Sequence, residues 1–279
     1  MKTACVFPGQ GSQTVGMGED LFQKYPEYIK TADEILGYSI AGLCLKDEQQ
    51  ALNNTEYAQP ALFVVNVLSY LDYLDANPAP AYLAGHSLGE YNALMASGIL
   101  SFEEGLQLVA IRGKLMSRIA GGAMAAVIGT GRKELQNILD EHSMEVEIAN
   151  YNSYLQNVIS GPTEKIAECE KFLREQKLKY MKLNVSGAFH SKYMEPVKEE
   201  FDVALSKMHL KAPKITVLSN YTGLPFTEDD VRTNLSMQLV SPVKWLDIVE
   251  TLLKETDEII QIGPGAVLDN LTKRIKKGK

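Results

Sequence analysis

The segment Gly85-His86-Ser87-Leu88-Gly89 decides how the fold of this chain is interpreted. It follows the short apolar run of residues 81–84 and precedes residues 90–96, which have the composition of a helix. A strand, a Gly-x-Ser-x-Gly turn and a helix in this order predict a nucleophile elbow, in which the serine Oγ stands exposed above the strand end. Because Gly and Ser are common, the three fixed positions occur by chance in roughly one such chain in ten. Ser87 is therefore a candidate nucleophile that needs partners elsewhere in the chain.

Length and composition describe an ordinary globular protein. With 279 residues, 45% of them hydrophobic and 23% charged, the chain can bury the core of one large domain or of a domain with an insertion. The net charge of −7 argues against nucleic-acid binding, which requires a basic face. No apolar stretch approaches the ~20 residues of a membrane span, and the N-terminal apolar run is too short for a signal peptide. We expect a soluble cytoplasmic protein that binds neither nucleic acid nor a membrane.

Cysteines and a basic cluster narrow the chemistry further. Cys5, Cys44 and Cys169 are odd in number and widely spaced, which indicates reduced thiols and predicts neither a metal site nor a disulfide framework. The basic cluster at the C-terminal end consists of Lys273, Arg274, Lys276, Lys277 and Lys279. We interpret this cluster as a solvated tail, with docking of an acidic partner as the alternative.

The order of the predicted elements indicates an α/β fold with a small inserted domain. Between residues 123 and 188 the patterns give strand, helix, strand, strand, helix and strand, at 125–128, 133–141, 146–149, 157–160, 164–176 and 179–183. This βαββαβ order is that of ferredoxin-like domains. We expect residues 1–122 and 189–279 to form a large α/β-hydrolase-like domain with a mostly parallel sheet, and residues 123–188 to form the inserted domain.

Two helices of the large domain have clear start signals. Pro60 is expected in the first turn of an apolar helix over residues 61–74. Ser101 and Glu104 make a capping-box pattern that predicts a helix to about residue 119. Arg112 lies at the edge of the apolar face of this second helix, where a charge without an anion is costly. The anion could be an internal carboxylate or the carboxylate of a substrate, or the side-chain stem could carry the guanidinium to solvent.

Ser87 needs a general base, and the chain has four histidines, His86, His142, His190 and His209. We favour His190 because it lies where the inserted segment rejoins the large domain, and clefts between domains are favoured sites. The only aspartate between Ser87 and His190 is Asp140, on a helix of the inserted domain, so the Ser, Asp, His order of a hydrolase triad has little support. A Ser–His dyad, with the imidazole held by a backbone or amide oxygen, is the better interpretation.

Several motifs occur together in one order along the chain. They are the loop Phe7-Pro8-Gly9-Gln10-Gly11-Ser12-Gln13, the segment Gly85-His86-Ser87-Leu88-Gly89-Glu90, the segment Arg112-Gly113-Lys114-Leu115-Met116, the segment Gly187-Ala188-Phe189-His190-Ser191, Gln238-Leu239 followed by Ser241-Pro242-Val243-Lys244-Trp245, and Gly263-Pro264-Gly265. Taken alone, the first loop is either a glycine-rich turn or half of an oxyanion hole. Together the motifs resemble malonyl-CoA:acyl-carrier-protein transacylases, including the stand-alone acyltransferases that serve polyketide synthases. The resemblance covers nearly the whole chain.

The resemblance implies a role for each matched position. Ser87 would be the acylated nucleophile and His190 its base. The other implied roles are these: oxyanion-hole N–H groups at Gln10 and Leu88, a malonyl-binding guanidinium at Arg112, a histidine-orienting main-chain carbonyl at Gln238, exclusion of 2-methyl branches by Phe189, and pocket lining by Met116 and Asn152. No metal is implied.

The resemblance also implies a reaction and partners. Malonyl-CoA would acylate the serine, CoA would leave, and the phosphopantetheine thiol of an acyl carrier protein would accept the malonyl group in a ping-pong sequence. Malonyl-CoA is then a substrate, no cofactor is held permanently, and we expect a monomer. The short chain end after Gly265 favours a stand-alone polyketide acyltransferase over a fatty acid enzyme. The alternative function on the same fold is a thioester hydrolase that clears wrongly loaded carrier proteins.

Overall fold

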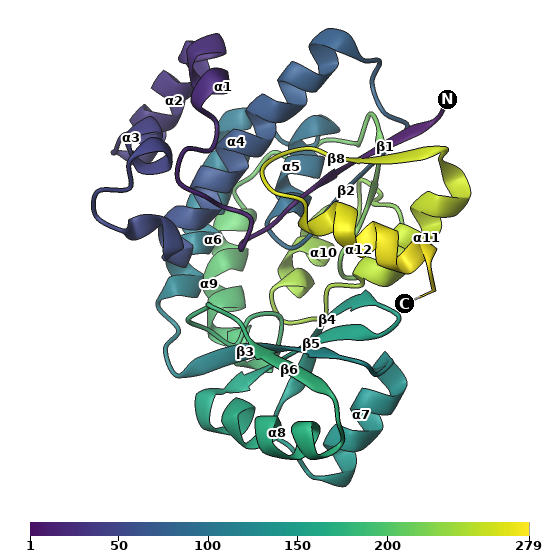
Figure 1. The fold of residues 1–279 in the computed structure, drawn as a ribbon. Helices are drawn as coiled ribbons and strands as arrows, with labels where there is room; N and C mark the ends of the chain where they lie inside the picture. Colours follow the sequence, from purple (N-terminus) through teal and green to yellow (C-terminus); the bar gives the residue numbers. More distant parts are fainter. Residues whose placement is uncertain (279) are drawn as a thin grey trace.

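A parallel four-stranded sheet forms the centre of the large part of the molecule (Figure 1). The computed structural model describes residues 1–278. Its first sheet has the order β7-β2-β1-β8, built from β1 (Thr3–Phe7), β2 (Tyr82–Gly85), β7 (Thr216–Leu218) and β8 (Glu258–Gln261). All its pairings are parallel, as the sequence predicts for a buried sheet of this kind.

Helices cover both faces of this sheet. The side chains of β1 alternate between two apolar cores: Cys5 and Phe7 join one of them, and Ala4 and Val6 join the other. The first core lies under α1 (Glu19–Lys24), α2 (Pro26–Leu36), α3 (Ile40–Leu45), α4 (Thr55–Ala76), α5 (Gly89–Ala96), α6 (Phe102–Ser117), α9 (Glu195–Leu205) and α10 (Val231–Gln238). The second lies under α11 (Trp245–Glu255) and α12 (Val267–Lys276). The result is a three-layer α/β arrangement.

A second sheet is antiparallel and lies below the first in Figure 1. Its strands are β3 (Gly122–Ile128), β4 (Glu147–Ser153), β5 (Gln156–Pro162) and β6 (Lys179–Lys182), in the order β4-β5-β3-β6. The helices α7 (Arg132–Glu141) and α8 (Thr163–Glu175) pack on one face through the third apolar core. The predicted βαββαβ order and the two-part α/β fold class are thus confirmed, and β3 begins at Gly122. The other face of this sheet is turned toward the large sheet.

The start predicted for the apolar helix α4 is wrong. The helix begins at Thr55, so Pro60 lies inside it and not in its first turn. Asn54 caps the helix, because its Oδ1 accepts a hydrogen bond from Glu56 N at 3.0 Å. The side-chain cap at Asn54, six residues before Pro60, therefore sets the start, and the helix accommodates a proline that lacks one backbone donor.

The capping box at the start of α6 is confirmed. Ser101 Oγ accepts from Glu104 N at 3.1 Å, and Ser101 N donates to Glu104 Oε2 at 2.8 Å. The helix ends at Ser117, two residues before the predicted end. Arg112 lies among the buried residues of this helix.

Three other expectations concern what the fold contains. The three cysteines are buried free thiols. Among residues 1–278 there is no cluster of His, Cys, Asp and Glu that could hold a metal ion. Over the same residues, no helix has the length and apolarity needed to cross a bilayer. Two short 3₁₀ helices, Ala51–Asn53 and Lys192–Met194, complete the described elements.

The C-terminal basic cluster lies on the last helix and just after it. Lys273, Arg274 and Lys276 are exposed on α12, and the exposed Lys277 follows it. Lys279 lies outside the described residues. The remaining four make no ion pair with a carboxylate among residues 1–278. This surface is therefore available to an acidic partner, which keeps the alternative interpretation open.

Candidate active site

Ser87 occupies a strained turn between β2 and α5. Its backbone is left-handed, with φ at 53°, a conformation that costs about 1–3 kcal/mol for a residue other than glycine. The glycines on either side are required by close backbone approach. A Cβ on Gly85 would lie 1.9 Å from the carbonyl of Gly89, and a Cβ on Gly89 would lie 2.0 Å from the oxygen of Phe7. The predicted nucleophile elbow is thus present, with Ser87 facing a cavity.

Asn220, which the sequence analysis did not single out, braces this turn. Its Oδ1 accepts from Ser87 N at 2.8 Å, and its Nδ2 donates to Gly85 O at 2.7 Å. One amide therefore bridges both sides of the elbow from the loop after β7. Nothing in the local sequence signals this contact, because the partners are more than 130 positions apart.

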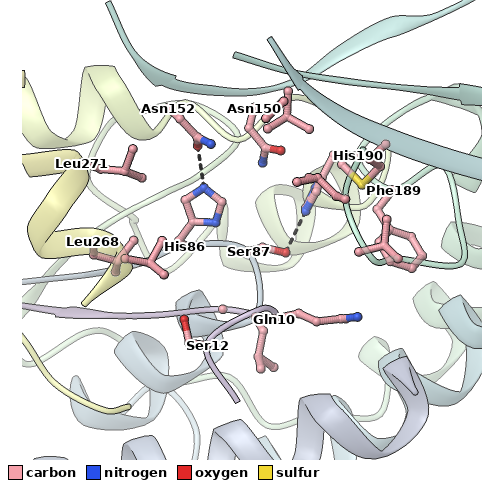
Figure 2. A pocket seen from close by; sticks show the side chains of 18 of the residues that line it. Gln10, Ser12, His86, Ser87, Asn150, Asn152, Phe189, His190, Leu268 and Leu271 are labelled. Atoms are coloured by element: carbon pink, nitrogen blue, oxygen red, sulfur yellow. Dashed lines mark hydrogen bonds between the residues drawn. The ribbon is translucent and has the colours of Figure 1, made fainter. Parts of the chain in front are cut away.

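His190 lies beside Ser87, as Figure 2 shows. Its Nε2 is 2.7 Å from Ser87 Oγ, and its Nδ1 is 2.8 Å from the main-chain oxygen of Gln238. Since a carbonyl oxygen can only accept, Nδ1 carries the proton and Nε2 is free to accept the hydroxyl proton of Ser87. Nδ1 is held by a carbonyl and not by a carboxylate. This geometry suits a serine activated by a base.

The other three histidines have structural or surface positions. His86 Nε2 lies 2.8 Å from Asn152 Oδ1, and its ring packs edge-on against Trp245. His142 and His209 are exposed. His86 is half-buried beside the elbow but points away from Ser87 toward Asn152 (Figure 2).

The pKa of His190 is shifted strongly downward. Burial lowers it from 6.5 to about 3, the nearby charge of Arg112 lowers it as well, and the hydrogen bond to the Gln238 carbonyl opposes both effects. The imidazole is therefore neutral at physiological pH, which is the form that can accept a proton.

Arg112 is buried, with 1% of its surface exposed, and its guanidinium points at Ser87. Its Nη2 donates to Ser87 Oγ at 3.2 Å and to Gln238 Oε1 at 3.0 Å, and its Nη1 donates to Gln59 Oε1 at 2.7 Å. No carboxylate of residues 1–278 lies within ion-pair distance of it.

These contacts decide two of the three interpretations of Arg112. The internal ion pair is wrong because the partners of the guanidinium are amides, and the stem that reaches solvent is wrong because the head is buried. Its Nε–H has no acceptor at all within the described chain. A buried cation with an unused donor is suited to binding an anion.

A cavity of about 230 Å³ opens onto Ser87, His190 and Arg112. The other residues that the sequence analysis placed at the site also line it, namely Gln10, Leu88, Met116, Asn152 and Phe189. Gln238 lies behind Arg112 and His190 and does not line the cavity. The exposed side chains of Met181 and Val267 line the cavity from β6 and α12, at its solvent side. The antiparallel sheet and the loops that follow β1 and β2 therefore enclose one site.

The backbone N–H groups of Gln10 and Leu88 donate no hydrogen bond to any atom of residues 1–278. Both residues line the cavity at the elbow, and the Gln10 side chain is held away from it by a bond to Thr55 Oγ1 at 3.1 Å. Unpaired backbone donors beside a nucleophile are suited to an oxyanion.

Glu90 is a second charged residue of the interior that the sequence analysis did not single out. It is 0% exposed and follows the elbow on α5. Burial raises its pKa to about 8, and hydrogen bonds from Asn220 and Gln238 oppose that shift. In sequence it reads as an ordinary acidic residue in the first turn of a helix, so no local signal marks it as buried.

Comparison with known proteins gives a consistent result. The model of the acyl transferase domain matches residues 4–277. The polyketide biosynthesis malonyl CoA-acyl carrier protein transacylase PksC of Bacillus subtilis is 47% identical over 277 residues, which are 98% of this chain and 96% of PksC. The chain also spans 36% of a longer polyketide biosynthesis protein of that organism, at 46% identity over 276 residues.

Solved structures agree with these relatives. The structure of malonyl CoA-acyl carrier protein transacylase from Burkholderia pseudomallei has a TM-score of 0.97 and 41% identity, and covers 100% of this chain and 99% of that one. A malonyl-transacylase in complex with a type II PKS acyl-carrier protein has a TM-score of 0.94 and 33% identity, and covers 100% of this chain and 95% of that one.

The downward pKa shift of His190 predicts the pH dependence of Ser87 reactivity. The neutral imidazole is the active form, so reactivity is lost only as pH falls through the lowered pKa. We expect inactivation by phenylmethylsulfonyl fluoride to keep its full rate well below pH 6.5, the ordinary histidine value. Arg112→Gln removes a positive charge that lowers the pKa of His190. In this variant the loss of reactivity at low pH should therefore begin at a higher pH than in the wild type. A wild-type loss centred at or above pH 6.5 would contradict the assignment.

Proposed function

Since this chain belongs to the acyl transferase family that includes the malonyl-CoA:acyl-carrier-protein transacylases, we propose that it transfers a malonyl group from malonyl-CoA to the phosphopantetheine thiol of an acyl carrier protein. The observation that carries this proposal is the guanidinium of Arg112. It is buried, lies 3.2 Å from Ser87 Oγ and has no carboxylate partner within the described residues. An acyl group on Ser87 that bears its own carboxylate would supply the missing anion.

In the first half-reaction Ser87 Oγ attacks the thioester carbonyl of malonyl-CoA. His190 Nε2, at 2.7 Å, takes the hydroxyl proton, while Nδ1–H stays bonded to the Gln238 carbonyl. The N–H groups of Gln10 and Leu88 stabilise the oxyanion. The C–S bond then breaks, and the CoA sulfur leaves with the proton from His190. A general base contributes roughly 10²–10⁴-fold, and an oxyanion donor roughly 10²–10³-fold.

In the second half-reaction the carrier thiol attacks the malonyl-serine ester. His190 accepts the thiol proton, the same N–H pair holds the new oxyanion, and the ester C–O bond breaks. Ser87 Oγ leaves and recovers the proton from His190. The sequence is ping-pong because CoA departs before the carrier protein reacts at the same serine.

Pocket residues account for acyl selectivity. The Arg112 fork favours a carboxylate-bearing group, since an acetyl group would leave its donors unpaired. Phe189 lines the cavity beside His190 and leaves little room for a 2-methyl branch, while Met116 and Asn152 shape the remaining walls. Asn152 is also the partner of His86, so its side chain is held in place.

We treat residues 123–188 as an inserted subdomain and residues 1–122 and 189–279 as the catalytic domain. The support for this division is that one face of the antiparallel sheet packs on its own helices α7 and α8.

Similarity to PksC supports a place in polyketide biosynthesis. Three buried free thiols fit the cytoplasm, and a monomer remains our expectation. A thioester hydrolase for neutral acyl chains would have no use for the charge of Arg112.

The carrier protein must approach the solvent side of the cavity, and α12 borders it. Leu268 and Leu271 line the cavity from this helix, and Arg274 Nη1 donates to Gln156, another lining residue, at 2.7 Å. The unpaired basic cluster continues from there along α12. An acidic face of the carrier would complement this helix while the phosphopantetheine arm reaches Ser87.

Acylation of Ser87 can be tested by intact mass spectrometry. Mixing the protein with malonyl-CoA should add one malonyl group, and Ser87→Ala should abolish the gain because the attacking oxygen is missing. A gain that survives Ser87→Ala, or no gain in the wild type, would refute the transferase proposal. Adding an acyl carrier protein separates transfer from hydrolysis: malonyl-carrier should accumulate, whereas free malonate as the main product would favour the hydrolase.

Arg112→Ala should reduce malonyl loading relative to acetyl loading by roughly 10- to 100-fold, because a hydrogen bond to a charged group contributes about 1.5–3 kcal/mol. Loading from malonyl-CoA and from acetyl-CoA is compared under identical conditions. Acetyl loading should be unchanged or higher, and an unchanged ratio would disprove the assigned role.

Charge reversal on α12 tests the docking of the carrier. The triple variant Lys273→Glu/Lys276→Glu/Lys277→Glu should raise KM for the carrier protein by about 10-fold through like-charge repulsion. Transfer to free pantetheine should be unaffected. The matched control is Lys30→Glu/Lys171→Glu/Lys207→Glu, at exposed lysines of other segments. An equal effect of both triple variants would show that the cluster is only a solvated tail.

A further inference from the structure

Glu90 is a buried carboxylate that the reaction described above does not use. Each of its oxygens accepts one hydrogen bond: Oε1 from Asn220 N at 2.5 Å and Oε2 from Gln238 Nε2 at 2.6 Å. No cationic side chain of residues 1–278 lies within ion-pair distance of it. A fully buried carboxylate without a paired cation is costly to the fold, so its retention calls for a physical reason.

The side-chain amide of Gln238 connects Glu90 with Arg112. Its Nε2 donates to Glu90 Oε2 and, at 2.9 Å, to Ser87 O, while its Oε1 accepts from Arg112 Nη2 at 3.0 Å. Because the NH₂ group faces two acceptors and the amide oxygen faces a donor, the amide can adopt only one orientation. If Glu90 were not an acceptor, the amide could turn and place its NH₂ group against the guanidinium.

The separation between Glu90 and Arg112 also affects how the guanidinium can bind an anion. Glu90 and Arg112 attract each other through the interior, and this attraction lowers the pKa of the carboxyl group. A carboxylate in direct contact would occupy the guanidinium fork and compete with an incoming anion. With one amide between them, Glu90 leaves the guanidinium fork open, and Nε–H still has no acceptor.

We propose that Glu90 is a positioning residue that acts through the Gln238 side chain. It orients the Arg112 guanidinium toward the acyl group on Ser87 without occupying the guanidinium fork. Glu90 thereby sets the preference for acyl groups that carry a carboxylate. This inference rests on the proposed malonyl transfer.

The test is Glu90→Gln, which keeps the shape and removes one acceptor. A glutamine can accept from Asn220 N or from Gln238 Nε2 but not from both, so a donor faces a donor at one of the two contacts. We expect the ratio of malonyl to acetyl loading, measured by intact mass spectrometry, to fall at least 10-fold. Acetyl loading itself should change less than threefold.

Asn220→Ala is the matched control. It removes the brace of the elbow but leaves the Asn220 backbone N–H bonded to Glu90. It should slow both acylations together and leave their ratio unchanged. A Glu90→Gln ratio within twofold of the wild-type ratio would overturn the inference, because a purely structural role lowers both rates equally.

A second variant keeps the test decisive if Glu90→Gln does not fold. Glu90→Gln/Gln238→Glu retains the net charge but moves the carboxylate into contact with Arg112. It should load acetyl groups and lose the malonyl preference, and a retained preference would overturn the inference. A wild-type protein that takes up no malonyl group would instead overturn the proposed function, on which this inference depends.

Discussion

The left-handed turn at Ser87 is the constraint on which the site depends. A backbone conformation that is unfavourable for serine persists only when its surroundings hold it, and here the support comes from distant parts of the chain. The Asn220 amide bridges Gly85 O and Ser87 N, and the Gln238 amide bonds Ser87 O. The first support comes from the loop after β7 and the second from α10, so the turn is held by parts of the chain that only the folded structure brings together.

The same turn organises the electrostatics of the interior. Arg112, Glu90 and His190 are all buried within one hydrogen-bonded network that passes through Gln238 and Ser87. Burial and the positive charge of Arg112 keep the imidazole neutral, and the Glu90 carboxyl group lies on the opposite side of Gln238 from Arg112. In the proposed reaction, proton acceptance by His190 and anion binding by Arg112 use one charge for two purposes, which a surface arrangement screened by water would not achieve.

Features set by neighbouring residues could be predicted from sequence, and features set by distant ones could not. The elbow and the capping box at Ser101 are each formed by residues a few positions apart, so sequence patterns identify them. The start of α4 differs from the one that Pro60 predicts because the side chain of Asn54 caps the helix and the interior of the helix tolerates the proline. Glu90 and Asn220 have no local signature, since their importance lies in contacts across 130 positions or more. Arg112 was open to three interpretations until its amide partners and its burial were known.

Residues 238–245 explain how a separate sheet can cover the site in a fixed position. Gln238 holds His190 at one end, and Trp245 packs against His86 at the other. Between them Val243 exchanges two backbone hydrogen bonds with β4, Val243 N to Ala149 O at 2.9 Å and Tyr151 N to Val243 O at 3.0 Å. Bonds of this kind set register as well as distance, because a slip of one residue would reverse the inward face of β4. The strand that supplies Asn152 to the cavity is therefore aligned by the same short segment that orients the imidazole. Cavity shape and general-base geometry are thus coupled through main-chain bonds, which side-chain substitutions in the pocket leave in place.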